Sequence, residues 1–213
     1  LGRVGSKLFG RTSGVDGLEA LGAPIHVAIF ASGAGSNAAK IIEYFSTRNT
    51  IEVAVIVCNK PDAGVLKIAA DHDIPTILIG KETFFRGDAY VAELKSLNID
   101  FIVLAGFLWK IPQQLIAAYP NKMINIHPAL LPKYGGKGMY GNKVHETVIA
   151  NKEKESGITI HFVNEHFDEG EHIFQATCSI DETDDAATLA AKIHLLEHEH
   201  FPKVIESVVD EKN

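Results

Sequence analysis

From Ile25 onward, short runs of β-branched and apolar residues alternate with longer segments in which apolar residues recur at helical spacing. This alternation is typical of proteins in which helices cover both faces of a mostly parallel sheet. The expected strands are His26–Ala31, Glu52–Cys58, Thr76–Ile79, Phe101–Leu104, Met123–Ile126, Ile158–Val163 and Ile173–Ser179. The expected helices are about Asn37–Phe45, Gly64–His72, Asp88–Leu97, Pro112–Ala118, Lys143–Ala150 and Ala186–Val209.

This plan contains no linker and no internal repeat, so it predicts one α/β domain over residues 25–213. The expected fold class is a Rossmann-like α/β/α arrangement of three layers around a mostly parallel, seven-stranded sheet. Pro112 suits the first turn of a helix, whereas Pro202 is expected to kink or cut the last helix. Ligands of such sheets bind at the carboxyl ends of the strands.

The segment Leu1–Pro24 differs from the rest because it is rich in glycine and has no periodic apolar pattern. It lacks the continuous apolar core of a signal peptide, and it has fewer Arg and Ser residues than a transit peptide. We therefore expect residues 1–24 to be an N-terminal extension outside the domain, either disordered or added artificially.

Composition narrows the classes of partner. The formal charge of −7 and the absence of a basic block argue against nucleic acid. The longest apolar stretch, Phe101–Trp109, is far shorter than the roughly 20 residues of a membrane helix, which argues against a membrane. Cys58 and Cys178 lie in separate apolar runs and are expected to be buried free thiols. We expect a cytoplasmic protein, a monomer or homodimer, with small-molecule partners.

A glycine-rich turn, Ser32–Asn37, connects the first strand to the first helix. Exposed amide hydrogens and the helix dipole at such a turn favour an anion, so the turn predicts a phosphate site. The spacing also fits the dinucleotide fingerprint loosely, but Cys58–Lys60 stands where an acidic residue should bind the ribose. On this motif alone, a tight turn that binds no ligand remains an alternative interpretation.

The fifth strand ends in Asn125-Ile126-His127-Pro128. Side chains two apart on a strand share a face, so Asn125 and His127 are expected to project together at a carboxyl end. An amide can donate to an oxyanion, and an imidazole can move a proton near neutral pH. A merely structural polar pair at a strand end is the competing interpretation.

A polar segment, Asn164–Gly170, follows the sixth strand. If it folds over the carboxyl edge of the sheet, one of its carboxylates can pair with His127 and raise the pKa of that imidazole. His194 and His198 are four apart on the last helix, but no complete zinc motif accompanies them, so we predict no metal site.

Taken together, four motifs resemble the phosphoribosylglycinamide formyltransferases, a family of folate-dependent purine-pathway enzymes. The resemblance extends over about Ile25 to Val209. The motifs are Ser32–Asn37, Leu104–Leu108, Asn125–Tyr134 and Gly157–Val163 with Asp168–Gly170.

The resemblance implies the formyltransferase fold and formyl transfer from 10-formyltetrahydrofolate, a co-substrate, to the amine of glycinamide ribonucleotide (GAR), without a metal. It also implies a role for each matching residue. The catalytic residues would be Asn125, His127 and Asp168; the GAR-binding residues Gly35, Ser36, Asn37, His194 and Glu197; and the folate-binding residues Arg86, Leu108, Trp109, Lys110, Ile111, Asn125, Val163, Asn164 and Asp168.

Three departures from the family pattern affect contacts rather than the reaction. Trp109-Lys110 stands where many members carry an arginine, and His194 stands where others use Lys or Gln. The segment Tyr134–Gly141 is longer and richer in glycine than usual.

Several rival functions stay open at this stage. Another enzyme that uses 10-formyltetrahydrofolate is one alternative, either a hydrolase or a transferase with a different amine acceptor. We expect neither methionyl-tRNA formyltransferase nor formyltetrahydrofolate hydrolase, because each carries an additional domain. A non-catalytic folate- or nucleotide-binding module would not need Asn125, His127 and Asp168 together. An NAD-dependent dehydrogenase is the most distant alternative.

Overall fold

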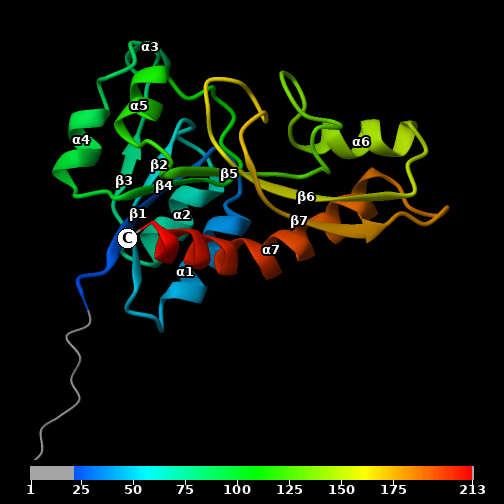
Figure 1. The fold of residues 1–213 in the computed structure, drawn as a ribbon, viewed down its shortest axis with the longest axis horizontal. Coiled ribbons are helices and arrows are strands. Elements are labelled where there is room, and N and C mark those ends of the chain that lie inside the picture. Colours follow the sequence, from blue (N-terminus) through cyan, green and yellow to red (C-terminus); the bar gives the residue numbers. More distant parts are fainter. Residues whose placement is uncertain (1–21, 213) are drawn as a thin grey trace, which may run out of the picture.

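The computed structural model describes residues 22–212, so the predicted extension at residues 1–24 lies almost entirely outside the described residues. Seven strands form one sheet in the order β3-β2-β1-β4-β5-β6-β7 (Figure 1). The strands are β1 (Ile25–Ala31), β2 (Ile51–Cys58), β3 (Thr76–Leu78), β4 (Phe101–Leu104), β5 (Met123–His127), β6 (Glu155–Phe162) and β7 (His172–Ser179). The first five strands pair in parallel, whereas β6 and β7 are antiparallel to their neighbours. The prediction of a mostly parallel seven-stranded sheet is confirmed.

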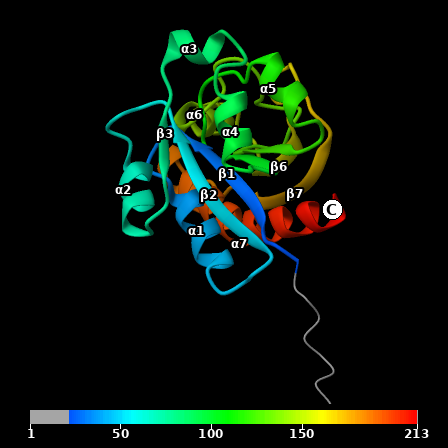
Figure 2. The ribbon, with the colours of Figure 1, turned by 90° about the vertical axis from the view of Figure 1, so that its left-hand side faces the viewer.

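Helices lie on both faces of the sheet (Figures 1 and 2). They are α1 (Ser36–Phe45), α2 (Gly64–Asp71), α3 (Lys81–Phe85), α4 (Val91–Ser96), α5 (Gln113–Ala118), α6 (Asn142–Ala150) and α7 (Ala186–Glu211). Pro112 precedes α5 as its N-cap residue, as its fixed backbone angle favours. None of the helices in the described part of the chain combines the length and the apolar character needed to cross a membrane.

The central strand β1 has a hydrophobic core on each of its faces. Val27, Ile29 and Ala31 point into a core formed with α1, α2 and α7, and each is 0% exposed. Ala28 and Phe30 point to the opposite face, where α3, α4 and α5 close a second core. Side chains alternate across a strand, so an uninterrupted apolar strand fits only a sheet that is covered on both faces.

Some sequence-based expectations differ from the structure. The short helix α3 was not predicted; it packs through Phe84, which is 2% exposed. Helix α4 begins at Val91 rather than Asp88, and β6 begins at Glu155 rather than Ile158. Cys58 is a buried free thiol as expected, but Cys178 is only half-buried because it lies on the edge strand β7.

Of the two effects expected of Pro202, a kink or a cut, the cut is wrong, because α7 spans Ala186–Glu211, close to the predicted Ala186–Val209. A proline inside a helix removes one backbone hydrogen bond. Pro202 is buried, and so are the nearby Phe201 and Ile205, each 0% exposed. Packing of this buried face of α7 against the sheet offsets the lost hydrogen bond. An N-terminal capping box, formed by Asp185 and Thr188, further stabilises the helix.

We expect Ile29→Ala to lower the free energy of unfolding by about 2–5 kcal/mol, because it removes a fully buried side chain from the central strand. The matched control is Leu195→Ala on α7, where the side chain is 70% exposed, and a change within about 0.5 kcal/mol is expected. Urea unfolding followed by circular dichroism gives both values. Equal effects in the two variants would contradict the assignment of β1 to the centre of the core.

Candidate active site

A cleft of about 700 Å³ lies at the carboxyl ends of β1, β4 and β5. Strands β1 and β4 are neighbours in the sheet, but β1 is followed by β2 on one side and β4 by β5 on the other side. The loops after β1 and β4 therefore diverge between the carboxyl ends of these two strands. Ligands of open α/β sheets bind at this switch point. The lining comes from residues 32–37, 104–111, 125–128, 136–142 and most of 163–168, with Lys60, His145, His161, Ala190, His194 and Glu197.

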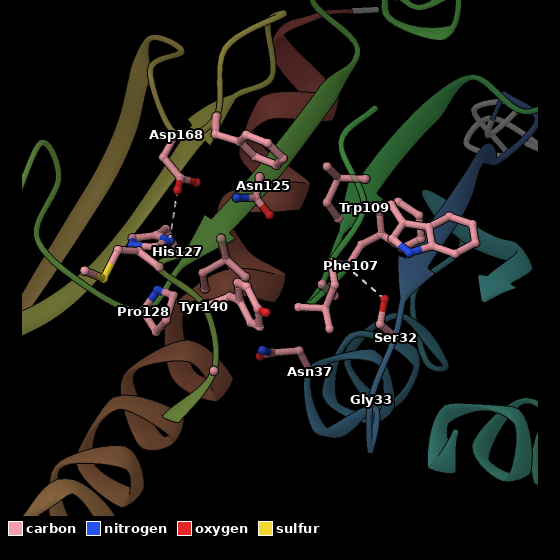
Figure 3. Close-up of a pocket in the computed structure, with 18 of the residues that line it drawn as sticks. Ser32, Gly33, Asn37, Phe107, Trp109, Asn125, His127, Pro128, Tyr140 and Asp168 are labelled. Carbon is pink, nitrogen blue, oxygen red and sulfur yellow. Dashed lines mark hydrogen bonds and ion pairs between the residues drawn. The ribbon is translucent and has the colours of Figure 1, made fainter. Parts of the chain in front are cut away.

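With one exception, the side chains singled out in the sequence line this cleft, as Figure 3 shows for several of them. The residues that line it are Gly35, Ser36, Asn37, Leu108, Trp109, Lys110, Ile111, Asn125, His127, Val163, Asn164, Asp168, His194 and Glu197. Arg86 is the exception: it follows α3, and its guanidinium pairs with Glu82 on the surface at 2.9 Å. A folate-binding role for Arg86 therefore stays a prediction.

His127 ends β5, and the residue is 4% exposed. Its Nε2 donates to the backbone carbonyl of Tyr134 at 2.7 Å, because a carbonyl only accepts. Its Nδ1 lies 3.5 Å from Oδ2 of Asp168, as the dashed line in Figure 3 marks. The predicted pairing of His127 with a carboxylate of the 164–170 loop is therefore present.

The Asp168 carboxylate acts on the pKa of His127 in the predicted direction, but the net shift is downward. Burial lowers the pKa of His127 below its usual value, although the Asp168 carboxylate and the Tyr134 carbonyl act in the opposite direction. Desolvation of the imidazolium outweighs the attraction of one carboxylate at this distance. The structure therefore favours the neutral imidazole of His127 over the imidazolium.

Asp168 connects His127 to a second histidine. Its Oδ1 lies 3.5 Å from Nε2 of His161, and its Oδ2 accepts the backbone N–H of Gly136 at 2.9 Å. Burial alone would raise the pKa of Asp168, but His161 and His127 in their protonated forms, together with the Gly136 N–H, lower it. Asp168 is therefore ionised, and it lies between two imidazoles.

His161 is a site residue that the sequence analysis did not single out. It pairs with Asn125 across the antiparallel strands β5 and β6, and Nδ2 of Asn125 donates to its Nε2 at 3.2 Å. Its Nδ1 donates to the carbonyl of Phe162 at 2.8 Å, which leaves Nε2 as the acceptor. Asn125 keeps its second N–H for a ligand. The strand register that brings His161 to Asn125 has no signature in the sequence.

The predicted anion turn lies on the opposite side of the cleft. Gly35 is the N-cap of α1, and its φ of +82° is one that L side chains rarely adopt. A Cβ at Gly35 would also lie 2.7 Å from Val65, so this position requires glycine. Gly35, Ser36 and Asn37, at the start of α1, line the cleft, and backbone amides at a helix N-terminus can bind an anion.

Asn37 and Glu197 link α1 to α7 at the floor of the cleft. Nδ2 of Asn37 donates to Oε2 of Glu197 at 2.9 Å, and Glu197 is 6% exposed. Burial raises the pKa of Glu197, while Asn37 and His194 act against that shift. The Oδ1 atom of Asn37 is buried and has no partner among the described residues, so it can accept a hydrogen bond from a ligand.

Aromatic side chains form the far end of the cleft. Trp109 contacts Phe84, Phe85 and Phe107, with ring centroids 5.6–6.3 Å apart. The loop that carries Phe107 and Trp109 is tied to β1, since the backbone N–H of Leu108 donates to the buried hydroxyl of Ser32 at 3.0 Å (Figure 3). This end of the cleft suits a flat apolar ligand, whereas the α1 end suits an anion.

The histidines of α7 do not form a metal centre in the structure. The rings of His194 and His198 stack with centroids 6.1 Å apart. Within residues 22–212, no group of three or more His, Cys, Asp or Glu side chains is arranged to hold a metal ion.

NMR titration of the substrate-free protein tests the electrostatics of this site. We expect a His127 pKa below 6.5, and a still lower pKa in Asp168→Asn, because that variant loses the carboxylate that attracts the imidazolium. The matched control is Glu165→Gln, which removes an exposed charge from the same loop and leaves His127 unaffected. A pKa that stays the same or rises in Asp168→Asn would contradict the proposed coupling.

Comparison with known proteins identifies the family. A family model described as formyl transferase matches residues 25–205. The chain is 38% identical over 192 residues to the chloroplastic phosphoribosylglycinamide formyltransferase of Arabidopsis thaliana, which covers 87% of this chain and 66% of that protein. It is 35% identical over 191 residues to phosphoribosylglycinamide formyltransferase of Bacillus subtilis, with 87% and 95% covered. The chain thus spans slightly less than two thirds of the plant relative.

Comparison with solved structures points to the same family as these relatives. The crystal structure of phosphoribosylglycinamide formyltransferase from Bacillus halodurans superposes with a TM-score of 0.80 at 36% identity, over 88% of this chain and 97% of that one. The resemblance that the motifs indicate is confirmed over nearly the whole described domain. The chain belongs to the formyl transferase family, in the branch formed by the phosphoribosylglycinamide formyltransferases.

Proposed function

We propose that this protein transfers the formyl group of 10-formyltetrahydrofolate to the amine of GAR. The products would be formyl-GAR and tetrahydrofolate, in a step of de novo purine (IMP) biosynthesis. One observation carries the proposal: Asn125, His127 and Asp168 meet on the wall of a cleft that has an anion-binding turn at one end and an aromatic surface at the other. Family membership supports the same reaction.

The two ends of the cleft suggest how the substrates bind. The phosphate of GAR would accept hydrogen bonds from the backbone at Gly35, Ser36 and Asn37, and its ribose would contact Glu197 and His194. The pteridine of the folate would lie in the apolar end, against the loop Leu108–Ile111 and beside Val163 and Asn164. This arrangement brings the amine and the formyl group together beside Asn125.

Asn125 is suited to stabilise the oxyanion. Attack of the amine nitrogen on the formyl carbon forms a C–N bond and moves the carbonyl electron pair onto oxygen, which gives a tetrahedral intermediate. One Nδ2–H of Asn125 is held by His161, and this contact fixes the amide of a residue that lines the cleft, with the other N–H left for a ligand. A donor fixed before the reaction stabilises developing charge without a reorganisation cost.

His127 and Asp168 are suited to move the proton. The attacking amine must lose a proton, and N10 of the folate must gain one as its bond to the formyl carbon breaks. Neutral His127 can accept the first proton and return it to N10, directly or through a water molecule. Asp168, 3.5 Å away, stabilises the imidazolium only while it exists. This route needs no metal ion and no covalent intermediate with the enzyme.

The location and the assembly of the protein remain part of the proposal. We retain the prediction of a cytoplasmic monomer or homodimer that acts on small molecules rather than on nucleic acid. The plant relative is named chloroplastic, which makes fractionation of the source cells the relevant measurement.

The first test is formation of tetrahydrofolate from 10-formyltetrahydrofolate in EDTA, with and without GAR. We expect turnover only when GAR is present, and no change when EDTA is omitted. Turnover with water alone would instead identify a hydrolase. A protein that binds both ligands without turnover would be a binding module, and the proposed function would be wrong.

The second test is Asn125→Ala, which removes the proposed oxyanion donor. We expect kcat to fall by about 100- to 1,000-fold, the usual effect of losing one such donor. The control is Asn49→Ala, an exposed asparagine between α1 and β2, which should keep wild-type kcat. A loss below tenfold in Asn125→Ala would exclude Asn125 from the oxyanion site.

A further inference from the structure

Tyr134 has an unusual backbone conformation in the turn that follows β5. Its φ is +57°, in the left-handed region that disfavours residues with a Cβ. Gly135 and Gly136 come directly after it, so a glycine at position 134 would fit this turn with less strain. A tyrosine held in such a conformation indicates that its side chain is needed there.

The Tyr134 side chain ties this turn to a distant part of the fold. Its hydroxyl donates to Oε1 of Glu153 at 2.7 Å, and its ring packs against the core that contains α7. Glu153 lies in the turn between α6 and β6, and the Tyr134 hydrogen bond lowers its pKa, so it is an ionised acceptor. Lys133 also contacts Oε1, at 3.3 Å, but this lysine is 69% exposed, so the pair contributes little.

The backbone of the same turn holds two of the proposed catalytic groups. The carbonyl of Tyr134 accepts Nε2–H of His127 at 2.7 Å, and the N–H of Gly136 donates to Oδ2 of Asp168 at 2.9 Å. Gly135, between them, passes so close to Leu131 and Asp168 that an added Cβ would lie 2.4 Å and 3.3 Å from their side chains. The turn therefore contacts both partners of the His127–Asp168 pair, and any shift of the turn changes their separation.

We propose that the hydrogen bond between Tyr134 and Glu153 positions His127 and Asp168 for catalysis. The bond anchors a turn that would otherwise relax from its left-handed conformation. Tyr134 and Glu153 are thus positioning residues: neither lines the cleft, and they act through the Tyr134 carbonyl and the Gly136 amide. The inference rests on the proposed function, because it assigns these residues to the same reaction.

The kinetic test compares Tyr134→Phe with Glu153→Ala and Glu153→Gln. We expect Tyr134→Phe and Glu153→Ala to lower kcat by about 10- to 100-fold, a range that corresponds to losing a hydrogen bond to a charged group. The KM values for both substrates should stay within about twofold, because both side chains lie outside the cleft. Glu153→Gln keeps an acceptor oxygen and should retain more activity than Glu153→Ala.

Tyr44→Phe is the matched control. The hydroxyl of Tyr44 donates to Glu206, which gives a second tyrosine–glutamate hydrogen bond, between α1 and α7 and outside the cleft. Tyr44→Phe should destabilise the fold to a similar extent and leave kcat unchanged. If Tyr44→Phe and Tyr134→Phe lost the same amount of kcat, the Tyr134 hydrogen bond would only stabilise the fold in general. That result would overturn the proposal.

A second measurement needs no substrate. The Nε2–H proton of His127 is buried and hydrogen-bonded in the wild type, so its NMR signal should exchange slowly with water. We expect faster exchange in Tyr134→Phe and wild-type exchange in Tyr44→Phe. Unchanged exchange in Tyr134→Phe would refute the positioning role even if the protein proved to catalyse a different reaction. If wild-type protein shows no formyl transfer but Tyr134→Phe does accelerate exchange, only the proposed function fails.

Discussion

The ionised carboxylate of Asp168 is the interaction on which the site depends. It lies 3.5 Å from an imidazole nitrogen on either side, with 11% of its side chain exposed. A carboxylate this buried would take up a proton if it had no partners, because burial disfavours the charged form. The Gly136 N–H favours its charged form, as do the two histidines when the nitrogen facing it carries a proton, and these groups come from β5, β6 and the turn before α6. Its charge therefore requires all three segments to be correctly folded.

Sheet topology explains how these segments meet. The parallel strands β1, β4 and β5 end at the same edge, so the anion turn, the aromatic loop and His127 all lie there. The antiparallel strand β6 then brings His161 opposite Asn125 and continues into the loop that carries Asp168. The apolar cores on both faces of β1 support this edge, and their packing offsets the unfavourable burial of His127, His161 and Glu197.

Some features of the fold and the site can be predicted from the sequence and others cannot, and the reasons are physical. The central strands β1, β4 and β5 could be identified because a strand buried on both faces needs a run of apolar residues, and such runs are visible in the sequence. The more exposed edge strands β3 and β7 could be recognised from their short β-branched runs. His161 could not be identified, because its role comes from pairing between strands. The helical pattern predicts α7 on both sides of Pro202, but the absence of a cut there could not be predicted, since burial of Phe201 and Ile205 outweighs a local helix breaker. The direction of the His127 pKa shift depends on burial, which no motif records.

That pKa shift also bears on how the proposed reaction would proceed. An imidazolium formed permanently by Asp168 would already carry the proton that the attacking amine has to lose. Burial keeps His127 neutral before the reaction, so the imidazole can accept this proton. The same low-polarity surroundings strengthen the attraction between Asp168 and the imidazolium once it forms. In the proposed reaction, burial and the carboxylate would thus act at different stages, and the stabilisation by Asp168 would appear mainly as charge develops, where it would accelerate the reaction.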